Sequence, residues 1–357
     1  MIGLIPSLRL QRKPVPIVGL AHLLLFDLLA VGMMLVCEKL KLPTINVSVR
    51  WGHFGRSLLP ITSVGVLMTI GMYGLLNVVR HMPELTVGQY LLFGIQGKLR
   101  AEIPWGQSFT AAHVALQVAA ILGMVVVQGR KLRLFIVMTS LGALAVYSVI
   151  YMSRIMLIPP LIALLVLYMQ KKSGSISTKK RNTIFIIMLI IVAYIYLAQG
   201  LRDYDIMGKL YTKSLLAWGV SRLLDYYIST ALYSAYIGSM VEHAEMSDPR
   251  FYFGAPEYTN IGSLGQLWRS FGITYLFVLL GFCFLVGKYW RRFYKGYTDG
   301  LIVFPFMVYS LLELPRMFEF TTVTGLVRLA LLVVCGWLFR NVPARGDFVS
   351  KNTSFGR

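Results

Sequence analysis

Charged residues are scarce in this chain of 357 residues: they make up 14% of it, whereas hydrophobic residues make up 57%. Soluble domains carry about 25% charged residues, so this composition excludes ordinary soluble enzyme folds. Acids are scarcest, with 15 Asp and Glu against 35 Lys and Arg. The net charge of +20 is compatible with nucleic acid or acidic lipid as a partner, so the location of the charges has to decide between them.

Cysteine is almost absent, and so are the common catalytic motifs. Cys37, Cys283 and Cys335 lie in or at the edges of apolar stretches, and none belongs to a C-x-x-C or Cys/His spacing. No disulfide framework and no metal site are therefore expected. The chain also lacks the P-loop, H-E-x-x-H, G-x-S-x-G and dinucleotide-binding fingerprints. No cofactor is expected, and the energy for a reaction has to come from the substrate.

Long apolar stretches take up most of the chain. They predict nine membrane spans, at 16–36, 58–79, 108–127, 134–152, 155–170, 182–200, 271–288, 300–315 and 320–339. No alternation of period two runs through them, so they predict helices and not a barrel. The expected fold is all-α: a polytopic helical membrane protein with about nine or more spans, forming a single integral membrane domain over 1–357.

Basic residues gather in short connecting stretches. Five of these hold 20 of the 35 Lys and Arg: 37–57, 128–133, 171–181, 288–295 and the tail that starts at Arg340. Lys and Arg next to spans are retained on the cytoplasmic side, so all five stretches are expected to face the cytoplasm. The net charge mostly reflects topology, and no nucleic-acid partner is expected.

The opposite face carries one long segment, 201–270, which holds seven of the 15 acids and many tyrosines. Its aromatic residues argue against disorder, and apolar residues over 215–228 recur at helical spacing, which predicts an amphipathic helix. Two interpretations stay open. The helix lies on the outer membrane surface with its tyrosines in the interfacial belt, or rings such as Tyr226 and Tyr227 form a platform for a sugar.

Arg154 interrupts an apolar stretch that runs from Leu134 to Met169, with no acidic residue nearby in the sequence. An isolated charge at membrane depth is costly and marks a functional candidate. The alternative is that Ser153 and Arg154 form the outer tip of a hairpin, with the guanidinium in water. The functional interpretation is favoured because a tip requires turn formers and because tyrosines and prolines flank Arg154, which suggests a shaped cavity.

Further arginines are expected on or near the outer face. They are Arg202, Arg222 and Arg316, with Arg328 inside the last span. Planar guanidinium groups suit a diphosphate better than lysines do, so a lipid-linked pyrophosphate is the natural ligand. Arg316 also has a structural interpretation, because Glu313 and Glu319 flank it and offer ion pairs.

One histidine, His243, lies in the long outer segment. It is a candidate general base, with Glu245 and Asp225 as runners-up, because abstraction of a hydroxyl proton requires a group poised near neutrality. The alternative is a solvated loop histidine. His22 and His113 sit in apolar spans and are expected to be packed or hydrogen-bonded to a neighbouring helix.

Four features of the sequence resemble the O-antigen polymerases, the Wzy family of bacterial polysaccharide repeat-unit polymerases. They are the hydropathy plan, the Ser153-Arg154 turn, the large outer loop and the run 259–263 that leads to Phe271-Gly272. The resemblance covers most of 80–340. It implies a GT-C-like glycosyltransferase architecture in the bacterial inner membrane, with the long loop and the active site facing the periplasm.

The resemblance implies that a glycan on undecaprenyl pyrophosphate is transferred to the non-reducing end of a new lipid-linked repeat unit, without metal or nucleotide sugar. Substrate and pyrophosphate would then be bound by Arg154, Arg202, Arg222, Arg316, Tyr226 and Tyr227, with Asp225, His243 or Glu245 as base. The implied partners are undecaprenyl-pyrophosphate-linked glycans, membrane lipid and a chain-length regulator protein.

Two other functions stay open at this point. A transporter or flippase of lipid-linked sugars commonly shows two related halves, and no internal repeat is found here. An O-antigen ligase uses the same donor chemistry, so the sequence separates it poorly from a polymerase.

Overall fold

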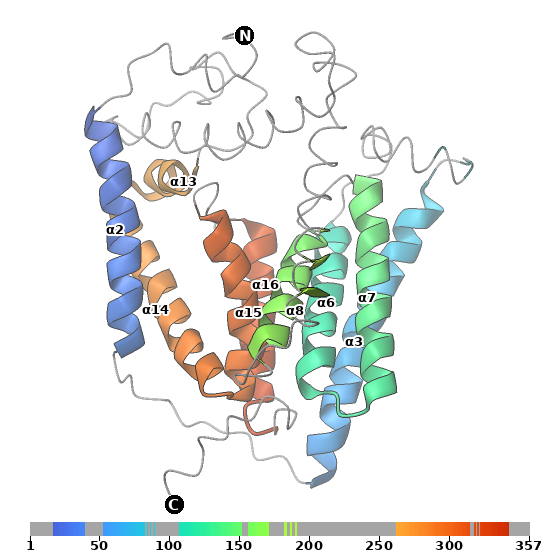
Figure 1. Cartoon of the computed structure of the whole chain (residues 1–357). Coiled ribbons are helices and arrows are strands. Elements are labelled where there is room, and N and C mark those ends of the chain that lie inside the picture. Colours follow the sequence, from blue (N-terminus) through green and yellow to red (C-terminus); the bar gives the residue numbers. More distant parts are fainter. Residues whose placement is uncertain are drawn as a thin grey trace, which may run out of the picture. The chain divides into compact units, whose positions relative to one another are not determined.

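A computed structural model describes residues 17–39, 53–82, 107–151, 156–170, 262–314 and 322–342, with a few single positions between them. Within these ranges every element is a helix (Figure 1). In order they are α2 (Ile17–Lys39), α3 (His53–Arg80), α6 (Gln107–Val126), α7 (Arg130–Tyr151), α8 (Ile158–Gln170), α13 (Gly262–Phe271), the 3₁₀ helix η2 (Gly272–Thr274), α14 (Tyr275–Tyr294), α15 (Thr298–Glu313) and α16 (Val323–Leu338). The all-α prediction is confirmed for this part of the chain.

Eight of the nine predicted spans coincide with these helices, and most of the ninth, 182–200, lies outside the described residues. Four segments are long and apolar enough to cross a membrane: Ile17–Val36, Leu58–Arg80, Arg130–Tyr151 and Gly272–Tyr294. The fold is that of a helical membrane protein. The full count of nine spans stays a prediction.

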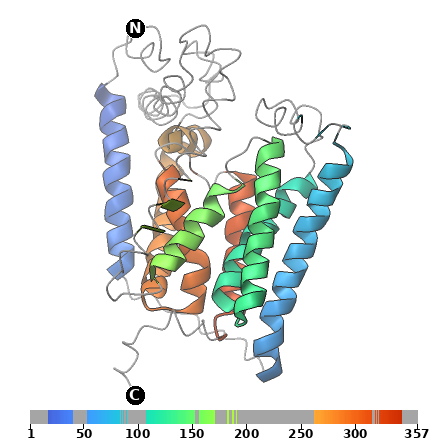
Figure 2. The same cartoon turned by 45° about the vertical axis from the view of Figure 1, so that its right-hand side comes forward.

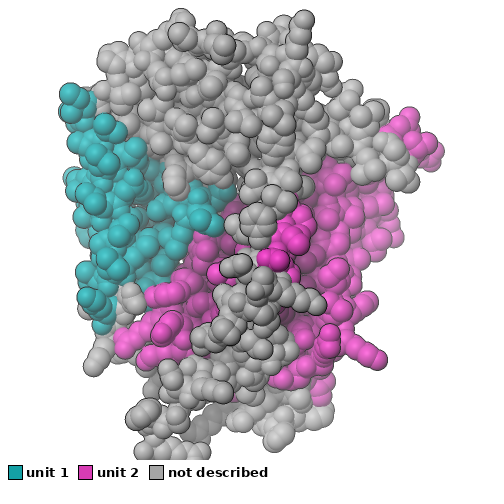
Figure 3. All heavy atoms as spheres, viewed as in Figure 1, with its two compact units in different colours: residues 1–40, 194–288, 310–322 teal, residues 41–193, 289–309, 323–357 magenta. Residues whose placement is uncertain are grey.

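The chain divides into two compact units, which Figure 3 shows in different colours. Unit 1 comprises 1–40, 194–288 and 310–322, and unit 2 comprises 41–193, 289–309 and 323–357. Unit 1 therefore contains α2, α13 and most of α14, whereas unit 2 contains α3, α6, α7, α8 and α16.

The core of unit 2 is built around α6. This helix has no charged residue and, apart from His113 and Gln117, is apolar around its buried length, which is typical of a helix with no exposed face. Every residue from Ala112 to Val127 except Met124 is buried. Helices α3, α7, α8 and α16 all contact α6.

Two glycines allow α3 to approach α6 closely. A methyl group added at Gly71 would overlap Leu116, and one added at Gly74 would overlap Ala112. Small residues at such positions let helix backbones pack tightly in membranes. Gly65 lies earlier on the same helix and has nothing within 4 Å of the position a methyl group would take.

These glycines give a matched pair of stability variants. We expect Gly74→Ala to lower the free energy of unfolding by about 1–3 kcal/mol, because the added methyl overpacks the α3–α6 contact. Gly65→Ala is expected to leave stability unchanged or raise it, because alanine favours helix and meets open space. Unfolding by SDS in mixed micelles measures both. Equal stability of the two variants would contradict the close α3–α6 contact.

Helix α14 ends in a glycine turn that leads directly into α15. Gly296 has φ 73°, a left-handed conformation that glycine adopts at low cost. The amides of Gly296 and Tyr297 donate to the carbonyls of Phe293 (2.9 Å) and Arg292 (3.0 Å). This pattern is the Schellman motif, which caps the free carbonyls at a helix C-terminus.

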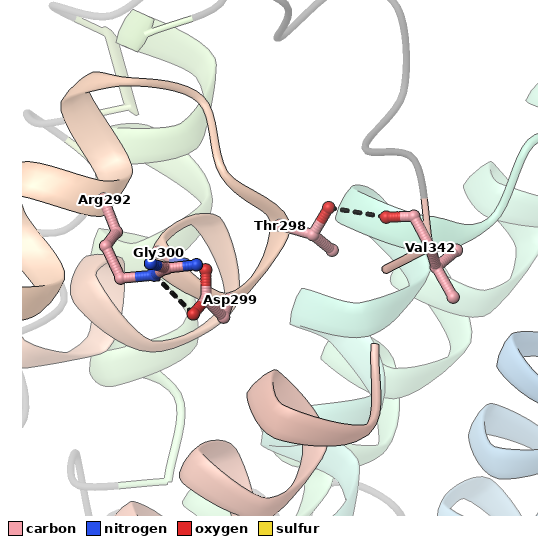
Figure 4. Close-up of polar contacts among 5 residues, drawn as sticks. All are labelled: Arg292, Thr298, Asp299, Gly300 and Val342. Carbon is pink, nitrogen blue, oxygen red and sulfur yellow. Dashed lines mark hydrogen bonds and ion pairs between the residues drawn. The ribbon is translucent and has the colours of Figure 1, made fainter. Parts of the chain in front are cut away.

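The same turn is fixed by an ion pair and two hydrogen bonds (Figure 4). Arg292 Nε lies 2.5 Å from Asp299 Oδ2, with side chains only 14% and 9% exposed. Asp299 Oδ1 accepts the Gly300 amide at 2.9 Å, and Thr298 Oγ1 donates to Val342 O at 2.7 Å. The end of α14, the start of α15 and the residues after α16 therefore meet at one end of unit 2, so two of the predicted basic stretches share a face.

In unit 1, α2 packs against α13 and α14 through aromatic side chains. His22 Nε2 lies 3.0 Å from the Tyr275 hydroxyl, and the His22 ring meets the Trp268 ring edge-on at 4.9 Å. Further along, the Cys283 thiol donates to Ala30 O at 3.5 Å. The expected interhelical contact of His22 is confirmed.

The His22–Tyr275 contact can be tested by removing one hydroxyl. We expect Tyr275→Phe to lower the free energy of unfolding by about 1 kcal/mol, because it deletes an interhelical hydrogen bond within the membrane. Tyr294→Phe is the control, since Tyr294 lies exposed on the same helix. Thermal unfolding measures both variants. If Tyr275→Phe loses no more stability than Tyr294→Phe, the His22–Tyr275 hydrogen bond does not stabilise the protein.

Candidate functional site

The residues predicted to form the site all lie outside the described part of the chain. They are Arg154, Arg202, Arg222, Asp225, Tyr226, Tyr227, His243, Glu245 and Arg316. Their roles stay predictions. Two of them lie in short gaps: Arg154 lies between the described residues Tyr151 and Met156, and Arg316 lies between Leu314 and Phe318.

Both residues that bound the Arg154 stretch are buried in the core of unit 2. Tyr151 and Met156 belong to the same hydrophobic cluster as Tyr147, Leu144 and Leu116. The last turn of α7 and the residues before α8 are thus fixed by packing against α6 and α7.

Polar side chains lie inside the apolar core of unit 2, near the junction between α7 and α8 that Tyr151 and Met156 bound. His113 and Gln117 lie four residues apart on α6, and Tyr147 and Tyr151 lie four residues apart on α7, so each pair shares a helix face. All four side chains are buried. Gln117 Nε2 donates to Met156 O at 2.7 Å, and the Tyr147 hydroxyl donates to Gly71 O at 3.4 Å.

Helix α8 begins beside the middle of α6. Its 13 residues cover about 20 Å, less than the about 30 Å of a bilayer core. Gln117, which holds Met156, is the eleventh residue of the 20 in α6. The end of α8 is fixed too, since Gln170 Nε2 donates to Phe293 O at 2.6 Å. Figure 2 shows that α8 runs obliquely to the direction of α7.

Two prolines lie at the start of α8. Pro159 and Pro160 lie in its first turn, where a helix amide has no acceptor and the fixed φ of proline fits. Helix α7 ends at Tyr151 and α8 begins at Ile158, so the two helices are separate, and Arg154 lies between them in the sequence.

Arg328 is a buried cation of unit 2. It lies on α16, is fully buried, and its guanidinium carbon is 4.5 Å from the centre of the Phe306 ring. Cation–π contact of this kind stabilises a desolvated guanidinium. The prediction that Arg328 lies inside the last helix is confirmed, and its depth in the membrane stays a prediction.

Gln117 was missed by sequence reasoning, whereas His113 was expected to be packed and the tyrosines that flank Arg154, Tyr147 and Tyr151, were expected to shape a cavity. A usable signal was present, because His113 and Gln117 are polar residues four apart in an otherwise apolar stretch. Among the described residues there is no group of three or more His, Cys, Asp or Glu that could hold a metal ion.

The fold and this junction define a class: a helical membrane protein with buried polar residues at a break between two helices. Comparison with protein-family models, with curated proteins and with solved structures finds no match to the chain.

Proposed function

We propose that the protein polymerises lipid-linked oligosaccharides, joining undecaprenyl-pyrophosphate-linked repeat units into a polysaccharide at the outer face of a bacterial inner membrane. The observation that carries this proposal is the setting of the Arg154 stretch, which starts and ends among buried residues and adjoins Gln117, Tyr147 and Tyr151. An arginine that lies in the sequence between two residues of this buried cluster suits an anionic ligand that reaches the protein from the bilayer.

The proposed reaction exchanges one bond at the anomeric carbon of the growing glycan. The bond from that carbon to the pyrophosphate oxygen breaks, and a bond to the acceptor hydroxyl oxygen forms. The acceptor proton passes to the base, for which His243, Glu245 and Asp225 are the candidates. Undecaprenyl pyrophosphate leaves with both bonding electrons, so guanidinium groups at Arg154 and the outer arginines would stabilise the developing charge.

Reconstitution tests the proposal directly. The purified full chain in nanodiscs, supplied only with authenticated lipid-linked repeat units, is expected to yield a ladder of longer glycans and release undecaprenyl pyrophosphate. No nucleotide sugar should be needed. Lack of both products with active substrate would rule out the polymerase.

Transport of the same lipid-linked sugars is the second candidate. It is favoured by one observation: α8 is a short helix that starts beside the middle of α6, and short or broken helices form substrate sites in transporters. A transporter would move labelled substrate across liposomes without joining units. An O-antigen ligase would release the same pyrophosphate but only when lipid A core is supplied as acceptor.

A further inference from the structure

Asp27 is an acidic residue at the centre of a membrane span. It is the eleventh of the 23 residues of α2, and the span Ile17–Val36 contains no other charged residue. A carboxylate in the middle of a membrane span is costly. Such residues normally face a protein interior, where a partner group offsets the cost.

In unit 1, however, Asp27 does not lie on the packed face of α2. That face is formed by Phe26 and Ala30, which are buried, and by His22, which contacts Tyr275. Successive residues are about 100° apart around a helix, so Asp27 points away from Phe26, and its side chain is exposed. α13 lies on one side of α2 in both views (Figures 1 and 2).

Asp27 has no hydrogen bond or ion pair with any residue that the structure describes. The basic residue at the end of the same helix, Lys39, is twelve positions away, about 18 Å along the axis. That distance is far beyond an ion pair. The cost of the carboxylate is therefore not offset within this part of the chain.

Apolar residues extend from Asp27 along one line of α2. Leu20, Leu24, Asp27, Val31 and Met34 follow each other at alternating spacings of four and three, which is the seam along which two helices pack side by side. Leu24 and Val31 are 55% and 58% exposed. The seam thus carries one polar residue at its centre, a position that sets register and partner in helix pairs.

We propose that this seam binds a transmembrane helix of another membrane protein, and that this helix carries a Lys, Arg or His at mid-membrane depth that pairs with Asp27. Charge complementarity identifies the partner, because a cation at that depth offsets the cost of both groups at once. A polar contact between helices in lipid also fixes which helix binds and in which register.

A second copy of this chain does not meet that requirement. A symmetric dimer through the seam places each residue opposite its own copy across the two-fold axis. Asp27 would then face Asp27, and two carboxylates repel each other where no water screens them.

Photo-crosslinking in native membranes tests the proposal on the full chain. A photoreactive amino acid is placed at Leu24 or at Val31 on the seam, and at Leu25 as the matched control. Leu25 is 52% exposed but lies about 160° around the helix from Asp27. One protein is expected to be crosslinked from Leu24 and Val31 and not from Leu25, through a transmembrane peptide that contains Lys, Arg or His.

Charge variants complete the test. Asp27→Leu is expected to lower the yield of the adduct by about tenfold, and it removes a charge from an apolar span, so insertion is retained. Asp27→Lys should abolish the adduct, and changing the partner's cation to Asp should restore it. Adducts formed only with lipid or with a second copy of the chain would overturn the proposal, and so would a crosslinked peptide that contains no Lys, Arg or His. It would also be overturned if the probe at Leu25 gave as much adduct as the probes on the seam, or if Asp27→Leu left the yield unchanged. None of these outcomes depends on the polymerase activity.

Discussion

Replacing Arg154 with alanine should remove the glycan ladder almost completely, with a fall in rate of about 100-fold or more. Removal of one group that stabilises developing negative charge costs a factor of about 10²–10³ in well-studied enzymes. The measurement is ladder formation by the reconstituted variant, with gel filtration to check the fold.

Two further variants isolate the role of Arg154. Arg154→Lys keeps the charge and loses the two-pronged geometry, so an intermediate rate is expected if a diphosphate is the ligand. Arg130→Ala removes an arginine from the exposed start of α7 and should leave the ladder within about twofold of the unmodified chain, because a basic residue there serves topology. Normal processivity of Arg154→Ala would remove Arg154 from the proposed mechanism.

The helices of the fold could be predicted from the sequence because lipid imposes a simple rule. Every backbone amide in hydrocarbon needs an internal partner, so each long apolar stretch has to be helical, and α2, α3, α7 and α14 follow. Which helix lies at the centre is harder to predict. The central place of α6 depends on Gly71 and Gly74 of α3 and on their contacts with Leu116 and Ala112, and tertiary contacts of this kind leave no periodic signal.

The site could be predicted less well, and the reason is spatial. Hydropathy identifies Arg154 as an anomaly because one charge interrupts an apolar stretch. It does not show that Gln117, far earlier in the chain, donates to the carbonyl of Met156, because that contact depends on how α6, α7 and α8 pack. Asp27 was overlooked for a different reason: one acid in a long apolar span does not alter the prediction of the span.

Arg292 also shows how a residue-type rule can hide a specific contact. Its place in a basic stretch next to a span classifies it as a cytoplasmic anchor. In the structure it pairs with Asp299 at 2.5 Å and lies 4.7 Å from the centre of the Tyr297 ring. The pair forms because the Gly296 turn brings the end of α14 back to the start of α15, and only a conformation with positive φ closes that turn.

This pair leads to the largest expected effect on stability. Asp299→Ala should lower the free energy of unfolding by about 3 kcal/mol or more, because breaking a buried ion pair leaves an uncompensated cation. The same substitution removes the acceptor of the Gly300 amide, so the start of α15 should also be weakened. SDS titration in mixed micelles measures the change, and protection of the α15 amides from hydrogen exchange locates it.

The matched control is the neighbouring arginine. Arg291→Met should change stability by less than about 0.5 kcal/mol, since Arg291 forms no ion pair with the residues that the structure describes and surface charges contribute little. Arg292→Met combined with Asp299→Leu should be less destabilising than the sum of the two single changes, because the buried charges are removed together. Strict additivity in this cycle would mean that Arg292 and Asp299 do not stabilise each other, and the α14–α15 turn would then depend on Gly296 and its backbone hydrogen bonds alone.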